Sequence, residues 1–155
     1  MKGTKTPVIP KRTVASALPP RPLVSVAPSD SALHAAKCMA EANCGSALVL
    51  SAGLIVGILT ERDLLIKVVA AASDPATTTV DCVMTRKPIC AHHDMPVTHA
   101  LYTMREFGFR HLPVIDAGRK PLGVFGMRDA LPEELAGAEN LTQRKSRLTA
   151  SLGPQ

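Results

Sequence analysis

Aromatic residues are scarce in this chain of 155 residues. It contains no tryptophan, one tyrosine and three phenylalanines, so aromatic side chains make up only 3% of the sequence. The 46% of hydrophobic residues are mainly alanine, valine and leucine, and any core must therefore be aliphatic. Proteins that bind single-stranded nucleic acid commonly stack bases on aromatic side chains. We therefore do not expect nucleic acid to be a partner.

The chain also lacks a long apolar run. The longest one, residues 47–59, is interrupted by Ser51 and Gly53 and is too short to cross a bilayer. The first residues are polar and do not resemble a signal peptide. The four cysteines show no C-x-x-C spacing, which favours reduced and buried thiols. These absences predict a cytoplasmic protein without a membrane partner.

The formal net charge is +5, and much of the excess lies near the two ends. Basic ends attract phosphate-bearing partners only weakly. We interpret them as solvated segments: a flexible basic arm over residues 1–12 and a tail over residues 136–155.

Hydrophobic periodicity predicts two similar series of elements, separated by a break at residues 73–75. The first series has a helical turn (13–18), a strand (22–26), a helix ending near residue 43, a hairpin (47–50 and 54–59) and a helix (61–72). The second has a helical turn (80–84), a strand (88–91), a helix (97–107), a hairpin (112–115 and 122–125) and a helix from residue 127 whose pattern fades after residue 135. Strands that alternate with helices indicate the α/β class.

The two series form an internal repeat. Residues 57–63 (GILTERD) and 123–129 (GVFGMRD) correspond at an offset of 66 positions, as do residues 13–14 and 79–80. A unit of about 60 residues is marginally stable alone. We therefore predict two pseudo-symmetric β-α-β-β-α repeats, at residues 13–75 and 76–135, packed through their sheets around one shared core.

Each repeat places a carboxylate at the start of a helix that follows a strand. In the first repeat, Thr60 and Asp63 have the spacing of a capping box. Free backbone N–H groups and the helix dipole favour an anion at such a helix start. Capping by itself also explains the pair, since a cap stabilises a helix by about 1 kcal/mol.

These features resemble the tandem cystathionine-β-synthase (CBS) domain pair, also called a Bateman module. Besides the two segments of the repeat, residues 83–88 (VMTRKP) and 109–114 (FRHLPV) carry the resemblance, which covers about residues 12–135. The resemblance implies a regulatory sensor that has no catalytic activity and no obligatory cofactor. It also implies that an adenosine nucleotide (AMP, ADP or ATP) binds between the repeats, and that the protein is a homodimer.

The resemblance also implies roles for residues of a first cleft. Asp63 is expected to accept hydrogen bonds from both ribose hydroxyls, and Thr60 is expected to meet the α-phosphate. Arg110 and His111 are expected to reach across from the other repeat toward the phosphate, for which arginine offers a permanently charged fork. The expected walls around adenine are Leu23, Val24 and Ile58.

The second cleft departs from this pattern. Gly126 stands where the hydroxyl is expected, and neither an arginine nor a histidine occupies the positions that match residues 110–111. Asp129 keeps the ribose acceptor, with Arg128 nearby. We therefore expect nucleotide in the Asp63 cleft and weak or no binding in the Asp129 cleft.

Three other functions are open to this chain. A metal site could be built from Cys90, His92, His93, Asp94 and His99, but their spacing matches no structural zinc pattern, and we expect no metal. An enzyme is not expected, because no nucleophile–base pair is evident. The main alternative is a protein-interaction module that has lost ligand binding and that regulates a partner enzyme or transporter.

Overall fold

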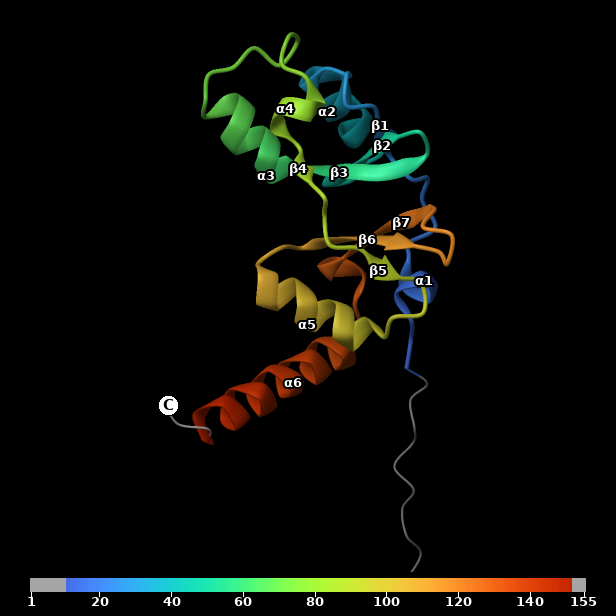
Figure 1. Cartoon of the computed structure of the whole chain (residues 1–155), viewed down its shortest axis with the longest axis vertical. Coiled ribbons are helices and arrows are strands. Elements are labelled where there is room, and N and C mark those ends of the chain that lie inside the picture. The colour runs from blue at the N-terminus through green and yellow to red at the C-terminus, as the bar shows by residue number, and fades with distance from the viewer. Residues whose placement is uncertain (1–10, 152–155) are drawn as a thin grey trace, which may run out of the picture.

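The computed structural model describes residues 11–151, with the side chains of residues 11–147. Its elements gather in two lobes, which lie one above the other in Figure 1. The first lobe holds β1 (Ser25–Val26), α2 (Ala32–Glu41), β2 (Ser46–Ser51), β3 (Leu54–Thr60), α3 (Glu61–Leu64), a π-helical turn (Leu65–Val69), α4 (Val80–Val83) and β4 (Thr85–Arg86). The second holds α1 (Val14–Ala17), β5 (Ala91–His92), α5 (Val97–Phe107), β6 (His111–Ile115), β7 (Pro121–Gly126), a 3-10 turn (Met127–Asp129) and α6 (Pro132–Ser151).

The two sheets repeat one pairing scheme. The first has the order β1-β2-β3-β4 and the second the order β5-β6-β7. In each, a short strand runs parallel to the first strand of an antiparallel hairpin. Ser46 pairs with Thr60 in the first hairpin, and His111 pairs with Gly126 in the second. The predicted α/β class and both predicted hairpins are therefore confirmed.

The two short helices are exchanged between the lobes. Helix α1 begins the first repeat in sequence, yet its Val14 and Ala17 are buried in the core of the second lobe with Phe125. Helix α4 begins the second repeat, yet Val80 and Val83 are buried in the core of the first lobe. Each lobe is thus completed by the first helix of the other repeat.

Two glycines allow the ends of these segments to approach the strands closely. A Cβ atom on Gly123 in β7 would lie 3.0 Å from Leu18, which follows α1. A Cβ atom on Gly57 in β3 would collide with Met84, which follows α4, and would lie 3.1 Å from the carbonyl oxygen of Thr85. The two contacts are related by the offset of 66 residues.

The prediction of one shared core was wrong, because each lobe buries a hydrophobic cluster of its own. Helices cover one face of each sheet, and side chains at alternate positions of the strands point to that face. Leu48 in β2 and Pro113 in β6 are buried but belong to neither cluster. They lie on the opposite faces of the two sheets, where the lobes meet, so the repeats do pack through their sheets.

Other elements differ from prediction in extent. The helix predicted over residues 61–72 changes to π-helical geometry after Leu64, with Ala70 N donating to Leu65 O. The strands predicted from Pro22 and Pro88 begin later, since proline cannot donate to a ladder. Strand β4 was not predicted from the sequence. The last helix begins at Pro132 and not at residue 127, and it continues through the predicted tail to Ser151.

Most of the predicted basic arm, residues 1–10, lies outside the described residues. Arg12 at its end is held in place. Its guanidinium donates to both carboxylate oxygens of Glu134, at 2.9 and 3.0 Å, and to the carbonyl oxygen of Asp129 at 3.0 Å. Within residues 11–151, no helix is long and apolar enough to cross a membrane.

Gly57→Ala should destabilise the protein by about 1–3 kcal/mol, because the added methyl group meets Met84 and a backbone carbonyl that cannot rotate away. Gly118→Ala is the matched control, since a methyl group there meets only the Asp116 carboxylate at 3.4 Å. Urea unfolding followed by circular dichroism should show a lower midpoint for the Gly57 variant alone. Equal midpoints would contradict the packing of the α4–β4 segment on β3.

Candidate functional site

The first helix start at the lobe boundary is closed by Thr60 and Asp63. The Thr60 hydroxyl accepts from Asp63 N at 3.2 Å, and the Asp63 carboxylate accepts from Thr60 N at 3.0 Å. The hydroxyl also donates to this carboxylate at 2.8 Å. The predicted capping box is therefore confirmed.

The second oxygen of the Asp63 carboxylate is also occupied. Lys67 Nζ donates to it at 2.7 Å and to the carbonyl oxygen of Val83 at 2.8 Å, and the Thr85 hydroxyl lies 3.4 Å away. The sequence analysis missed both donors. The spacing of four residues between Asp63 and Lys67 is a signal for an ion pair on a helix. Thr85 comes from β4 and has no local signal.

The second helix start holds the equivalent carboxylate, Asp129, with different partners. Gly126 N donates to Oδ2 at 2.8 Å, and Arg21 Nη2 lies 3.8 Å from the same oxygen. Among the described residues, no donor is hydrogen-bonded to Oδ1 of Asp129. This carboxylate therefore keeps one acceptor oxygen, whereas that of Asp63 keeps none.

A cavity of about 40 Å³ has Arg21, the ion-pair partner of Asp129, in its wall. Its walls come from the segment after α1, from the chain leading into β2, and from β7. The lining residues are Leu18, Pro19, Arg21, Pro22, Leu23, Val24, Cys44, Ser46, Leu122, Gly123 and Val124. Binding sites for small molecules commonly measure about 300–1,000 Å³. The cavity must therefore widen before it admits a nucleotide.

Leu23 and Val24, which were expected in the Asp63 cleft, line a cavity with Gly123 and with Arg21, the partner of Asp129. Val24 also packs against the core of the first lobe, so the pair lies where the two lobes meet. Ile58 stays on the Asp63 side, where it pairs with Thr85 across β3 and β4.

His111 reaches across the lobe boundary, as predicted. A Cβ atom on Gly45 would lie 3.2 Å from His111 Nε2 and 3.2 Å from the carboxylate of Glu61, the first residue of α3. Arg110 stays nearer the second helix start, where its carbonyl accepts from Met127 N at 3.1 Å. The side chains of Arg110 and Arg128 are exposed.

Burial lowers the pKa of His111, because the charged imidazolium is poorly solvated at this boundary. Glu61 and Asp129 oppose the shift, while Arg21 and Arg110 add to it. At neutral pH the imidazole is therefore neutral. Its surroundings contain charged groups from both lobes, so it is sensitive to a charged ligand in either cleft.

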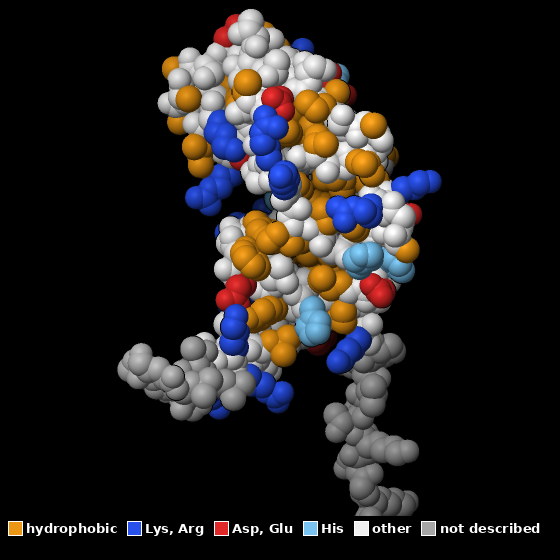
Figure 2. Space-filling model, in the orientation of Figure 1, with side chains coloured by type: hydrophobic (Ala, Val, Ile, Leu, Met, Phe, Trp, Pro, Cys, Tyr) orange, Lys and Arg blue, Asp and Glu red, His pale blue; other side chains and the backbone are white. Residues whose placement is uncertain are grey.

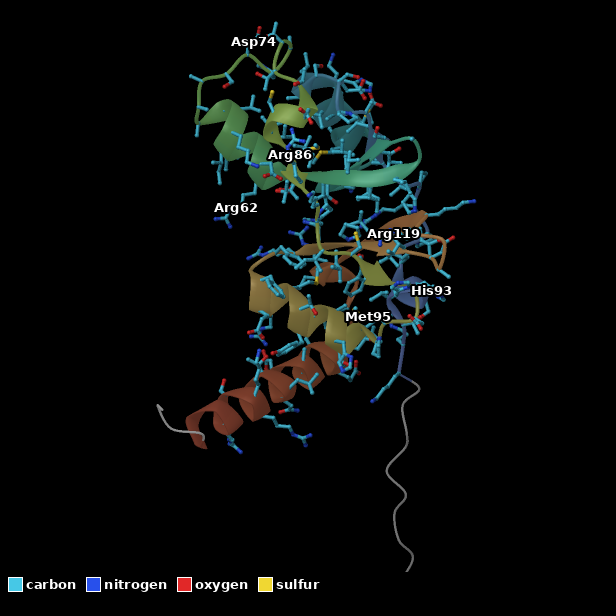
Figure 3. All side chains as sticks on the ribbon, in the orientation of Figure 1. Arg62, Asp74, Arg86, His93, Met95 and Arg119 are labelled. Carbon is cyan, nitrogen blue, oxygen red and sulfur yellow. The ribbon has the colours of Figure 1, made fainter. Side chains whose placement is uncertain are left out.

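Cationic side chains also border the boundary between the lobes. Figure 3 shows Arg62 beside α3 and Arg86 beside β4 on the first lobe, and Arg119 near β6 and β7 on the second lobe, on the opposite side of the view from Arg62. Arg86 is paired with Asp81 at 2.8 Å, whereas Arg62 has no ion-pair partner in the described part of the chain. Such a rim suits an anionic ligand. Within the described residues, no three His, Cys, Asp or Glu side chains are grouped as a metal site.

The comparisons with known proteins agree with this architecture. A sequence model of the CBS domain matches the chain twice, over residues 14–70 and 80–134. The chain belongs to the CBS domain family. Its two lobes are thus a tandem pair of CBS domains, as the sequence predicted.

Relatives of this CBS pair come from several kingdoms. A CBS domain-containing protein of Arabidopsis thaliana is 43% identical over 91 residues, which is 59% of this chain but only 16% of the plant protein. The structure of a protein from Burkholderia ambifaria, described as a signal-transduction protein with CBS domains, is 34% identical with a TM-score of 0.69 and covers 75% of this chain and 86% of its own. A CBS domain pair solved with 5′-methylthioadenosine and S-adenosyl-L-methionine is 30% identical with a TM-score of 0.68, covering 77% and 93%.

His111 should make the stability of the CBS pair depend on pH. Its pKa is lower in the folded protein than the ordinary value of about 6.5 expected for the unfolded chain. Below that value the unfolded chain binds more protons, so acidification favours unfolding. His111→Gln should therefore lose less thermal stability than the wild type between about pH 7 and pH 5, whereas His99→Gln, at an exposed position of α5, should behave as the wild type. An unchanged pH profile in the His111 variant would contradict the prediction.

Proposed function

We propose that this CBS pair is a regulatory module that binds an adenosine-containing ligand, such as AMP, ADP or ATP, between its repeats. The main support is the presence of two equivalent helix starts at the lobe boundary, each with a carboxylate, of which that of Asp129 has an oxygen that can accept from a ribose hydroxyl. The 30% identical CBS pair that was solved with two adenosyl compounds supports the same class of ligand. The proposed role is to sense a ligand, without catalysis.

The geometry favours the Asp129 cleft as the first site to be occupied. Arg21, the ion-pair partner of Asp129, lines the cavity together with the apolar side chains of Leu23 and Val24, and Oδ1 of Asp129 has no donor among the described residues. In the Asp63 cleft, a ribose would have to displace Lys67 or Thr85. Binding of nucleotide in the Asp63 cleft, which the sequence analysis favours, stays a prediction.

Ligand binding would act by shifting the packing of the two lobes. The cavity is lined by Cys44 and Ser46 from the first lobe, and by residues 122–124 from the second. Because its volume is only about 40 Å³, a nucleotide would have to move these walls apart. A ligand biases such an equilibrium only if it makes different contacts in the two packings. Contacts to both lobes at once satisfy that condition.

An exposed apolar face supports a second function, that of a protein-interaction module. Leu65, Ile66 and Val69 lie in the π-helical turn after α3 and are 59%, 51% and 69% exposed. Figure 2 shows hydrophobic side chains along this edge of the first lobe. A second copy of the chain, or a regulated enzyme or transporter, would bury them. This function requires no ligand in either cleft.

A thermal-shift experiment separates the two functions. A ligand at 100 times its dissociation constant stabilises a protein by about 2.7 kcal/mol, which raises the Tm of a chain of this size by several degrees. We expect such a rise for at least one of AMP, ADP and ATP, with guanosine nucleotides as the control. No rise with any adenosine-containing compound would favour the interaction module.

The two clefts can be distinguished by calorimetry with the ligand that gives the largest shift. Asp129→Asn should weaken binding by about 10-fold or more, because a charged acceptor is lost. Asp63→Asn should have a smaller effect, since both oxygens of Asp63 already have donors in the protein. The temperature should be one at which both variants are folded. The opposite order of effects would support the sequence-based choice of the Asp63 cleft.

A further inference from the structure

We infer that Arg21 selects adenosyl ligands that carry a phosphate. In the ligand-free protein it is the counter-ion of Asp129, and on binding it would move to the phosphate and release the carboxylate to the ribose. This inference rests on the proposed function and goes beyond it, because it names the chemical feature that the cleft recognises. Arg21 lies in the segment after α1, outside the repeated motifs.

The contact of Arg21 with Asp129 is loose. Arg21 Nη2 lies 3.8 Å from the carboxylate, beyond hydrogen-bonding distance, and the Arg21 side chain is 45% exposed. Arg12 offers a contrast in the same neighbourhood, since it holds both oxygens of Glu134 at 2.9 and 3.0 Å. Arg12 is therefore fixed in its place, whereas Arg21 can exchange its partner for a better one.

The backbone at Arg21 is restricted, so that this exchange involves the side chain alone. Prolines occupy positions 19, 20 and 22, and each fixes its own φ and limits the residue before it. Arg21 N donates to Pro19 O at 2.8 Å, which closes a tight turn. The turn places Arg21 on the wall of the cavity, beside Leu23 and Val24.

The charge balance explains the selection. A phosphate gives Arg21 a bidentate anionic partner, while Asp129 accepts from the ribose. A neutral ligand such as 5′-methylthioadenosine can also donate to Asp129, but it offers Arg21 no anion and so gains nothing from this arginine. The sulfonium of S-adenosyl-L-methionine would add a positive charge near Arg21 and Arg110, both of which already act on His111. The cleft should therefore prefer AMP to either compound, although a relative was solved with both of them.

Calorimetry on the full chain with AMP and 5′-methylthioadenosine tests the inference. The wild type should bind AMP more tightly. Arg21→Met should weaken AMP binding by about 10-fold or more, while 5′-methylthioadenosine binds as before or more tightly. Arg21→Lys should recover part of the preference. Arg105→Met is the matched control, since Arg105 is 46% exposed and makes a similarly loose ion pair with Glu139, at 3.4 Å, on α5 and α6.

The ratio of the two affinities decides between the outcomes. If it is the same in Arg21→Met and in the wild type, Arg21 does not meet the phosphate and the inference is overturned, even where adenosyl binding itself is established. An equal loss for both ligands has the same consequence, because it reflects a structural role of the turn. If the folded wild type binds neither ligand, the proposed function fails, and the inference fails with it.

Discussion

The exchange of α1 and α4 between the lobes is the constraint on which the rest of the structure depends. Each lobe buries a short helix that belongs to the other repeat, α1 in the second lobe and α4 in the first. The segment after each short helix must therefore cross the lobe boundary to reach the strands of its own repeat. Gly57 and Gly123 accept this crossing, because a side chain at either position would meet the crossing segment. The crossing segments form walls of the two clefts. The exchange of the short helices therefore completes both cores and also creates the candidate sites.

The two clefts differ in the side chains that surround the carboxylate at the helix start. In the first, Lys67 and Thr85 saturate the carboxylate at the helix start. The equivalent positions of the second repeat, at an offset of 66, are Glu133 and Pro19, neither of which can donate a hydrogen bond from its side chain at neutral pH. The carboxylate there is met by Arg21 at longer range. Both repeats thus have the carboxylate, but among the described residues that of Asp129 lacks the side-chain hydrogen bonds found at Asp63 and keeps the one from Gly126 N.

The local elements could be predicted from the sequence, but the exchange of α1 and α4 between the lobes could not. Hairpins and the helix Val97–Phe107 follow from periodicities of two and 3.6 residues, and the helix was predicted with its observed bounds. The capping box follows from spacing. A helix of four residues, such as Val14–Ala17, has too little pattern to reveal which core it enters. Each short helix was therefore assigned to its own repeat, and the cavity that Leu23 and Val24 share with Arg21 was not predicted. His111 was placed across the boundary only because a family resemblance implied it.

Two separate cores suit the proposed sensing role better than the one core that was predicted. A packed interior changes little in shape and resists small displacements, so a shared core would hold the repeats in one arrangement. Here each core is closed within its lobe, and the boundary contains polar groups such as His111 beside apolar ones. Movement at that boundary leaves both cores intact. It would still be transmitted, because Arg12 joins the carbonyl of Asp129 to Glu134 in the first turn of α6. The burial of Ala138 in the second core fixes α6 to its lobe. A change at the second helix start therefore has a direct mechanical route to the longest helix of the protein.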